Sequence, residues 1–331
     1  EAGTGVGGTW YWNRYPGARF DSESWTYGYS FSQALLEEWD WEEHFAAQPE
    51  TERYLNYVAD KFDLRRDIQL RSRVTAAHYQ EDTRRWDVIV EGGRRYTTRL
   101  LLTAIGVLSA ATMPTIPGVA TFQGQSCHTH DWPKEPVRFA GKRVAVIGTG
   151  ATGVQTITEV AKTAGHLTVF QRTPQWCAPL HNARISPEEM ARIRAEYPTI
   201  FARCQETYGC FIHTTDPRAT SEVTLEAREA FWEKLYGEPG FGIWMGNFRD
   251  ILVDREANQL ISDFLARKIR QRVKDPAVAE KLIPHNHGFG TRRVPLESGY
   301  FEVYNQPNVT LVDITETPIE RITPTGITTS D

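Results

Sequence analysis

The amino-acid sequence predicts an α/β fold, and the main support lies in one stretch of the chain. A short apolar run rich in β-branched residues, 143–147, leads directly into the glycine-rich segment 148–153. A segment with helical character, 154–162, and a second apolar run, 167–172, follow. Strand, glycine turn, helix and strand in this order make one βαβ unit of a parallel sheet. The first strand is expected to be buried on both faces.

The three glycines of this turn have the GxGxxG spacing of dinucleotide-binding sites. We expect Gly148 to make the tight turn, Gly150 to let a pyrophosphate approach the backbone, and Gly153 to let helix and strand pack closely. The pyrophosphate would then lie on the unpaired amides of the helix N-terminus. The alternative is a tight turn that binds nothing. The predicted dinucleotide contacts in this unit are Thr149, Gly150, Ala151, Thr152, Gly153, Val154, Gln155 and Thr173.

The end of the second strand distinguishes between the two nicotinamide dinucleotides. An NAD site has Asp or Glu at this point, whereas this chain has Gln171 and Arg172. A guanidinium can pair with a 2′-phosphate through two parallel hydrogen bonds, and a carboxylate would repel it. The sequence therefore predicts NADPH. The alternative for Arg172 is a solvated charge at a strand end.

Composition narrows the classes of function. The 331 residues, 40% of them hydrophobic, suffice for two domains. The net charge is -5, and acidic and basic residues are mixed along the chain. Because no basic region stands out, nucleic acid is not an expected partner. No apolar run is long enough to cross a membrane. Four cysteines without a CxxC pair favour a reducing, cytoplasmic compartment. Because the histidines lack ligand spacing, no metal is expected.

The remaining elements follow from caps, periodicity and turn residues. Glu1 runs directly into a glycine-rich turn and the sequence stops where a strand pair begins, which predicts an internal part of a longer protein. We expect Ser32 to cap a short helix reaching Trp41, and Pro49 to begin another helix. Further helices are expected at 186–211, 222–236 and 254–273, as an insertion that packs on the sheet. Strands are expected at 68–79, 86–90, 95–104, 309–314 and 319–323, with 100–106 buried.

Three motifs, in order along the chain, resemble those of Baeyer–Villiger monooxygenases. Residues 122–133 match FxGxxxHxxxWP, and residues 7–21 match [A/G]GxWxxxx[F/Y]P[G/M]xxxD at every fixed position. Residues 289–293 resemble the FGT[K/R]R segment of the same family. The resemblance extends over essentially the whole chain. It is strongest to the branch that contains phenylacetone, steroid and polycyclic-ketone monooxygenases.

This resemblance implies two Rossmann-like dinucleotide-binding domains in three layers, one for FAD and one for NADPH. The FAD-binding domain would occupy 1–117 without its first GxGxxG, and 118–140 would be the interdomain linker. The NADP-binding domain would occupy 141–313, with the helical insertion at about 180–288, and 314–331 would return towards the FAD domain. By family position, Glu1 binds the FAD ribose. The positions that usually contact the flavin cofactor are Thr9, Trp10, Asp21, Tyr27 and Val74.

The resemblance also implies a reaction in which NADPH, O2 and a ketone give an ester or lactone. A hydride passes from NADPH to FAD, and the reduced flavin adds O2 at C4a to form the peroxide that attacks the carbonyl. Arg293 would stabilise the peroxide anion and the oxyanion of the adduct. The alternative for Arg293 is a contact with a cofactor phosphate. Arg292 would form a clamp with Arg172 at the 2′-phosphate, and Arg293 is also expected to contact NADP.

Asp21 is the second predicted catalytic residue, because a carboxylate beside Arg293 would fix the guanidinium. Without the motif, an Asp after a turn is usually a cap or a solvated charge. In the linker motif, Phe122, Gly124, His128 and Trp132 are the marked residues, and His128 is interpreted as a hydrogen-bonded linker residue instead of a general base.

Two competing functions remain. One is a flavin monooxygenase that oxygenates nitrogen or sulfur, although such proteins usually lack the Trp132-Pro133 ending. The other, for this segment in isolation, is an NADPH-binding module whose FAD site is incomplete.

Overall fold

A computed structural model describes all residues from 1 to 331, and its contacts divide the chain into two compact units. The first unit comprises Glu1–Arg14, Gln48–Met113 and His128–Trp132. The second comprises Tyr15–Ala47, Pro114–Cys127 and Pro133–Asp331. No helix in either unit has both the length and the apolar character needed to cross a membrane.

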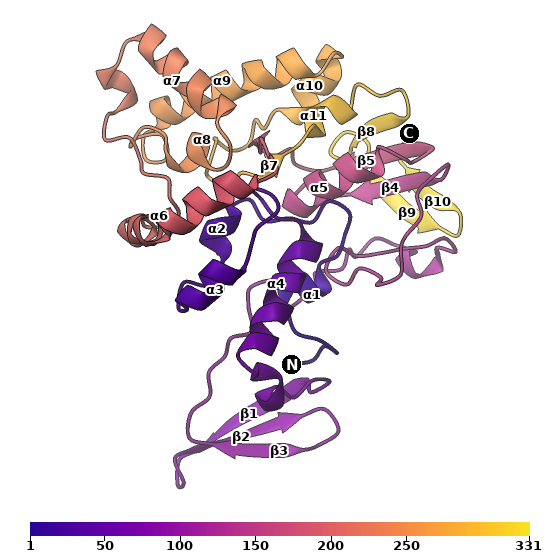
Figure 1. Cartoon of the computed structure of the whole chain (residues 1–331). Coiled ribbons are helices and arrows are strands. Elements are labelled where there is room, and N and C mark those ends of the chain that lie inside the picture. The colour runs from indigo at the N-terminus through magenta and orange to yellow at the C-terminus, as the bar shows by residue number, and fades with distance from the viewer. The chain divides into compact units, whose positions relative to one another are not determined.

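The first unit consists of helices and one antiparallel sheet (Figure 1). Its elements are α1 (Thr9–Trp12), α4 (Gln48–Lys61), η1 (Leu64–Asp67), β1 (Val74–Gln80), β2 (Arg85–Val90) and β3 (Arg95–Thr98). Helix α4 begins where Pro49 predicted a helix start, and it buries Tyr54, Val58 and Ala59 along one stripe. The sheet has the order β1-β2-β3, and Gly92 and Gly93, both at positive φ, turn the chain between β2 and β3.

The expected strand at 100–106 is wrong. Strand β3 ends at Thr98, and the residues after it form an exposed loop in which Leu102 is 89% exposed and Val107 is 98% exposed. An apolar run becomes a strand only where a neighbouring strand can satisfy its backbone amides and carbonyls, and this run pairs with none. The expected strand at 68–79 is also shorter than predicted, because β1 begins at Val74.

The second unit contains the predicted βαβ unit. Strand β4 (Arg143–Ile147), helix α5 (Ala151–Val160) and strand β5 (His166–Gln171) follow one another, and β4 pairs with β5 in parallel. Strand β8 (Val309–Asp313) pairs with the other side of β5, so that the sheet order is β4-β5-β8. The expectation that β4 is buried on both faces is wrong. As an edge strand it exposes every second residue, whereas the central β5 is buried at four of its six positions.

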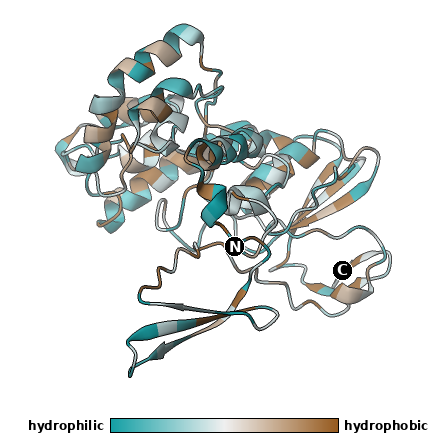
Figure 2. Cartoon of the chain, turned by 60° about the horizontal axis from the view of Figure 1, so that its bottom comes forward, coloured by the Kyte–Doolittle hydropathy of each residue, from teal (hydrophilic) through white to brown (hydrophobic).

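A helical insertion follows the βαβ unit, as predicted, and its helices begin at polar caps. Ser186, Thr224 and Asp254 accept hydrogen bonds from amides in the first turns of α6, α7 and α9. The helices of the insertion are α6 (Pro187–Glu206), η3 (Thr220–Glu222), α7 (Leu225–Gly237), α8 (Gly242–Met245), α9 (Arg255–Arg272) and α10 (Pro276–Leu282). Helix α6 is shorter than the predicted 186–211, since the chain leaves it at Thr207. In Figure 2, hydrophobic and hydrophilic positions lie along the same helices, as amphipathic packing requires.

Shorter elements complete the second unit. They are α2 (Ser24–Tyr27), α3 (Gln33–Glu38), η2 (Val119–Thr121), β6 (Ala178–Pro179), β7 (Leu296–Glu297), α11 (Tyr300–Val303), β9 (Ile319–Thr323) and β10 (Gly326–Thr329). Ser32 caps α3 as predicted, but the helix ends at Glu38 instead of reaching Trp41. Strands β6 and β7 pair in parallel, and β9 and β10 form an antiparallel pair.

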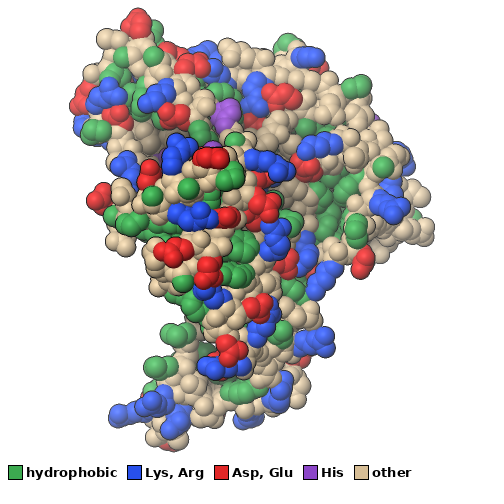
Figure 3. Space-filling view, viewed as in Figure 1, with side chains coloured by type: hydrophobic (Ala, Val, Ile, Leu, Met, Phe, Trp, Pro, Cys, Tyr) green, Lys and Arg blue, Asp and Glu red, His purple; other side chains and the backbone are tan.

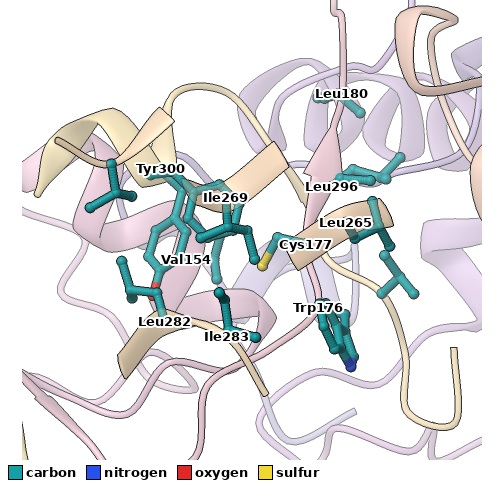
Figure 4. Packing of buried hydrophobic residues seen from close by; sticks show 14 of the residues in the cluster. Val154, Trp176, Cys177, Leu180, Leu265, Ile269, Leu282, Ile283, Leu296 and Tyr300 are labelled. Carbon is teal, nitrogen blue, oxygen red and sulfur yellow. The ribbon is translucent and has the colours of Figure 1, made fainter. Parts of the chain in front are cut away.

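The core of the second unit joins the insertion to the βαβ unit. Figure 4 shows side chains from α5, α9, α10 and the β6 and β7 segments gathered around Cys177. Val154, Leu265 and Leu282 in this cluster are at most 1% exposed. Beside the cluster, Arg272 of α9 binds the buried Glu297 at 2.7 Å and also Glu302 at 2.6 Å. The insertion is therefore a fixed part of this unit and can hold loops near α5 in place.

Candidate active site

The glycine-rich turn between β4 and α5 has the geometry that its spacing predicts. Gly148 lies at φ +104°, where a side chain would be strained, and its amide donates to the carbonyl of Phe170 at 2.9 Å. A Cβ on Gly153 would lie 2.3 Å from the carbonyl oxygen of Gly148, so only glycine allows this approach. Nothing lies within 4 Å of the position that a Cβ on Gly150 would take. The backbone of the turn is therefore accessible at Gly150 and tightly packed at Gly153.

The first turn of α5 has free capacity for an anion. Gly150 is the N-cap and supplies no side-chain acceptor to the amides that follow. Thr149 Oγ1 donates to the carbonyl of Thr173 at 2.9 Å, which ties the turn to the segment after β5. Uncapped amides at a helix N-terminus fit the pyrophosphate of a dinucleotide. Ala151 and Thr152 are half-buried in this first turn, and Val154 is fully buried beneath it.

The end of β5 separates two neighbouring side chains. Gln171 is fully buried, and its Nε2 donates to the carbonyl of Lys281 at the end of α10, at 2.6 Å. Arg172 is exposed. The side chain at the position where NAD sites have a carboxylate is thus used within the protein, and the neighbouring guanidinium is left to solvent or to a ligand.

The 288–293 loop, which carries Arg292 and Arg293, is fixed by two polar side chains of α9 that sequence reasoning missed. Asn258 Nδ2 donates to the carbonyl of Phe289 at 2.8 Å, and Ser262 Oγ accepts from the Phe289 amide at 3.1 Å. Phe289 itself is fully buried. The available signal was that Asn258 and Ser262, four residues apart, lie among the apolar residues of α9.

Arg293 and Asp21 meet, although 272 residues separate them along the chain. Arg293 Nη2 donates to Asp21 Oδ2 at 2.8 Å; the carboxylate is 1% exposed and the guanidinium side chain is 57% exposed. One end of the pair is therefore anchored in the protein, and the other end presents N–H groups outward. The structure thus brings together the two residues that the motif resemblance related, and their catalytic roles stay predictions.

Burial and charge act in opposite directions on Asp21. Burial raises the pKa of Asp21 to about 6, although the positive charge of Arg293 lowers it. Tyr15 is also buried, and its pKa is raised far above the ordinary value by burial and by the charge of Asp21. At neutral pH the carboxylate is ionised and can hold the guanidinium.

Arg292 is exposed and lies near His287. The pKa of His287 is lowered first by burial and then by the charge of Arg292. The predicted clamp of Arg292 and Arg172 stays a prediction, although both side chains are exposed. No group of three or more His, Cys, Asp or Glu side chains is arranged to hold a metal ion.

The side chain of Gln155, another predicted NADP contact, is engaged inside the second unit. Its Oε1 accepts from the hydroxyl of Tyr15 at 3.0 Å, and its Nε2 donates to the carbonyl of Arg19 at 3.1 Å. These contacts leave the side chain of Gln155 directed at the 15–21 segment.

Four of the predicted FAD contacts lie in the first unit. Glu1 is exposed, and its Oε1 accepts from the Gly3 amide at 2.7 Å. Thr9 is exposed at the start of α1, and the carbonyl of the buried Trp10 accepts from Gln48 of α4. Val74 begins β1 and is 56% exposed. In the second unit, Tyr27 ends α2 and stacks on Phe20 with ring centroids 4.2 Å apart.

The linker motif forms two local turns. A Cβ on Gly124 would lie 2.5 Å from the ring of Phe122, so the glycine gives that ring its place. His128 Nδ1 accepts from the His130 amide at 3.1 Å, and Trp132 is half-buried. His128 is thus a hydrogen-bonded turn residue.

The chain is similar to several known monooxygenases. The sequence profile of flavin-binding monooxygenase-like proteins matches residues 30–196. The chain is 52% identical to 2-oxo-Delta(3)-4,5,5-trimethylcyclopentenylacetyl-CoA monooxygenase of Pseudomonas putida, over 100% of the chain and 62% of that protein. It is 43% identical to acetone monooxygenase (methyl acetate-forming) of Gordonia sp. strain TY-5, with the same coverage. It is 42% identical to a phenazine N-monooxygenase of Lysobacter antibioticus, over 100% of the chain and 61% of that protein.

Solved structures agree with this result. The crystal structure of OTEMO in complex with FAD and NADP is 52% identical and superposes with a TM-score of 0.98, over 100% of this chain and 63% of that one. The chain thus spans about 62% of the length of the first curated relatives that it matches. These comparisons confirm the mixed α/β fold and the family resemblance that the motifs predicted.

Proposed function

The chain belongs to the flavin-binding monooxygenase-like family, and we propose that it is part of an FAD- and NADPH-dependent Baeyer–Villiger monooxygenase. The proposed reaction converts a ketone and O2 into an ester or lactone. The observation that carries the proposal is the Arg293–Asp21 pair, a half-exposed guanidinium fixed by a buried carboxylate. The conversion named for the Gordonia relative, acetone to methyl acetate, is a reaction of this type.

We infer the domain organisation from the motif order. The proposal assigns 1–117 to FAD, 118–140 to the linker and 141–313 to NADPH, with 314–331 returning to the FAD domain. Each dinucleotide would have its own Rossmann-like domain. The chain spans 62% of the length of the Pseudomonas relative, so the activity proposed here is that of a whole protein of this family. For this segment alone, the alternative of an NADPH-binding module stands.

The residues present fit an NADP molecule at the glycine-rich turn. The open space beside Gly150 and the uncapped first turn of α5 suit a pyrophosphate, which would lie against the backbone of 149–155. Arg172 and Arg292, both exposed, would pair with the 2′-phosphate. Thr173, joined to Thr149 by a hydrogen bond, would line the same edge.

The residues proposed for FAD by family position are Glu1, Thr9, Trp10, Asp21, Tyr27 and Val74. Glu1 supplies the carboxylate expected at a ribose. When bound, the flavin takes the hydride of NADPH and supplies one oxygen atom of O2 to the ketone. We propose a cytoplasmic location, where NADPH is the common reductant and the four free cysteines stay reduced.

Arg293 contributes charge and direction. Asp21 accepts one of its five N–H groups, and the remaining donors are available to an oxyanion at the exposed end. A guanidinium stays charged at any pH of interest, so it stabilises negative charge on reacting oxygens without exchanging a proton. Asp21 orients it, and the loop that carries it is held because the Phe289 carbonyl accepts from Asn258 and the Phe289 amide donates to Ser262. The donors are therefore in place before negative charge develops on the reacting oxygen atoms.

A specific observation favours a second candidate function, oxygenation of nitrogen. The Lysobacter relative is named a phenazine N-monooxygenase and is 42% identical to this chain, against 43% for the acetone monooxygenase. N-oxygenation inserts no oxygen beside a carbonyl and migrates no carbon. A phenazine and a ketone assayed side by side would separate the two functions, because only the ketone reaction gives an ester.

The test of the proposed function is NADPH oxidation by the full-length protein with bound flavin, over a panel of ketones, with products identified. We expect an ester or lactone that contains one added oxygen atom. NADPH consumption that yields only hydrogen peroxide with every ketone, together with an N-oxide from a phenazine, would replace the proposal with the second candidate.

A further inference from the structure

Gln155 joins the dinucleotide-binding helix to the loop that carries Asp21. It lies just over one turn into α5, and its amide group makes two hydrogen bonds with the 15–21 segment of the same unit. The hydroxyl of Tyr15 donates to Oε1 at 3.0 Å. Nε2 donates to the carbonyl of Arg19 at 3.1 Å. Both ends of the amide are therefore satisfied by this one loop.

The backbone of the loop reinforces this contact. Gly17 lies at φ +79°, and a Cβ there would be 2.8 Å from the carbonyl oxygen of Gln155 and 2.9 Å from Cγ of Glu159. Only glycine allows the loop to lie directly against the helix. A cavity of about 50 Å³ beside the contact is lined by residues of both segments. The loop and the helix are thus in direct contact through both backbone and side-chain groups.

The same loop leads directly to the catalytic pair. Tyr15 is buried, and its pKa is raised by burial and by the charge of Asp21 and lowered by the charge of Arg293. Asp21 follows Arg19 by two residues and holds Arg293 at 2.8 Å. A chain of contacts therefore runs from α5 through Gln155 and the 15–21 loop to Asp21 and Arg293.

We propose that Gln155 is a positioning residue that sets the place of the Asp21–Arg293 pair relative to the glycine-rich turn. The inference rests on the proposed function and gives Gln155 a different role from contact with NADP through its side chain. A dinucleotide bound at 148–153 would move or stiffen the N-terminus of α5, and Gln155 would pass this change to the loop. Asp21 would keep the direction of Arg293, and the bound dinucleotide would adjust the position of the pair as a unit.

Variants of the full-length protein test this proposal. Gln155→Met keeps the length of the side chain and removes both hydrogen bonds, and Tyr15→Phe removes one. Asn308→Ala is the matched control, because it removes a hydrogen bond from a side chain to a backbone carbonyl, that of Ala164 at 3.0 Å, elsewhere in the same unit. We expect Gln155→Met to lower the ester formed per NADPH oxidised by about three- to ten-fold, as the loss of one or two hydrogen bonds would. Tyr15→Phe should give a smaller decrease, and NADP⁺ affinity should change less than about two-fold in both variants.

Gln155→Glu supplies a conditional rescue. A protonated Glu can donate to the carbonyl of Arg19 as Gln does, whereas an ionised Glu repels it. Relative to the wild type at each pH, this variant should lose only the bond to Arg19 at pH 9, giving a yield between those of Gln155→Met and the wild type, and should approach the wild type at pH 5. A merely structural role would not give this pH dependence.

A second readout does not depend on ester formation. In the wild type and in Asn308→Ala, saturating NADP⁺ should shift the pH at which the melting temperature reports the titration of Asp21. In Gln155→Met this shift should disappear. If the wild type makes no ester, the proposed function fails while this readout still tests the link. Equal ester yield in Gln155→Met and Asn308→Ala, or a ten-fold loss of NADP⁺ affinity with unchanged yield, would overturn the role of Gln155.

Discussion

Arg293 and Arg172 both lie at the proposed cofactor and reaction site, but the protein prepares them differently. Arg293 is held at 2.8 Å by a carboxylate that is 1% exposed, on a loop fixed by two side chains of α9. Arg172 is exposed, and the neighbouring Gln171 is buried against the end of α10. The first guanidinium has its direction set by the fold, and the second offers its charge to whatever binds.

This difference matches the demands of the two proposed roles. Negative charge on a reacting oxygen is short-lived, so the donors that stabilise it must be in place beforehand. A 2′-phosphate carries its negative charge before and after it binds. The binding energy of the dinucleotide can therefore order an exposed arginine side chain at the moment of binding. The same residue type thus suits both roles: Arg293 is held in one direction by its partners, and Arg172 is left exposed to adjust to a ligand.

The first prediction concerns Arg293 and has the largest expected effect on activity. Arg293→Ala in the full-length protein should lower ester formation by about 10²- to 10³-fold, because a preorganised donor is lost, while NADPH still reduces the flavin. Product analysis and flavin absorbance measure the two steps separately. Arg267→Ala, which removes an exposed arginine paired with Glu229, is the control. A normal ester yield from Arg293→Ala would contradict the catalytic role.

The second prediction concerns Asp21 and has opposite signs for stability and activity. Because burial raises its folded-state pKa to about 6 from 3.8, the carboxyl favours the folded state when protonated, and this contribution is lost as the pH rises through about 6. Asp21→Asn should therefore raise the free energy of unfolding at pH 8 by up to about 3 kcal/mol and by little at pH 4. Ester formation should fall, because Arg293 loses its ionic partner.

Melting temperatures of the wild type and Asp21→Asn at the two pH values measure this effect. A variant that is less stable than the wild type at pH 8 would show that the ion pair with Arg293 outweighs the burial of the charge.

The third prediction tests the adaptable side. Arg172→Ala should raise the KM for NADPH by about one to two decades, since a charge-assisted contact contributes roughly 1.5–3 kcal/mol. The KM for NADH should stay nearly constant, because NADH lacks the 2′-phosphate. Steady-state kinetics with both dinucleotides measure the difference. An equal rise for both would assign Arg172 to a part of the dinucleotide that the two share.

The fourth prediction concerns Gln171, which precedes Arg172, and has the smallest expected effect. Gln171→Glu would place a carboxylate oxygen where Nε2 now donates to the Lys281 carbonyl. We expect a loss of about 1–3 kcal/mol of stability and no gain in the use of NADH, because this side chain points into the protein. Thermal unfolding and the KM for NADH measure both. A KM for NADH that improves ten-fold would mean that the side chain turns towards the ribose.

Local pattern predicted the parts of the fold whose residues determine their own structure. The β4–α5–β5 unit and the cap at Ser32 formed as expected because each depends on neighbouring residues. The strand expected at 100–106 failed because a strand also needs a partner, which no local pattern reveals. The prediction that β4 is buried on both faces failed for the same reason. Its place at the edge of the sheet depends on β8, which follows more than 160 residues later in the chain.

The site divides in a similar way. The strain at Gly148 and the close contact at Gly153 could be predicted from spacing alone. The meeting of Asp21 and Arg293 could not, because neither residue signals the other across 272 positions, and only the family motifs related them. Asn258 and Ser262 were missed because their function, fixing the 288–293 loop, is visible only once the packing of Phe289 is known.

The surface differs between regions in a way that has a practical consequence. On the face seen in Figure 3, acidic and basic side chains are interspersed without a large area of one sign. The loop after β3 is different, because it presents a row of bare apolar side chains: Leu100, Leu102, Ile105 and Val107 are each at least 75% exposed. Unpaired backbone groups beside exposed apolar side chains favour association with other polypeptide chains. We therefore expect charged replacements at Leu102 and Val107 to reduce association between copies of a polypeptide made of these 331 residues.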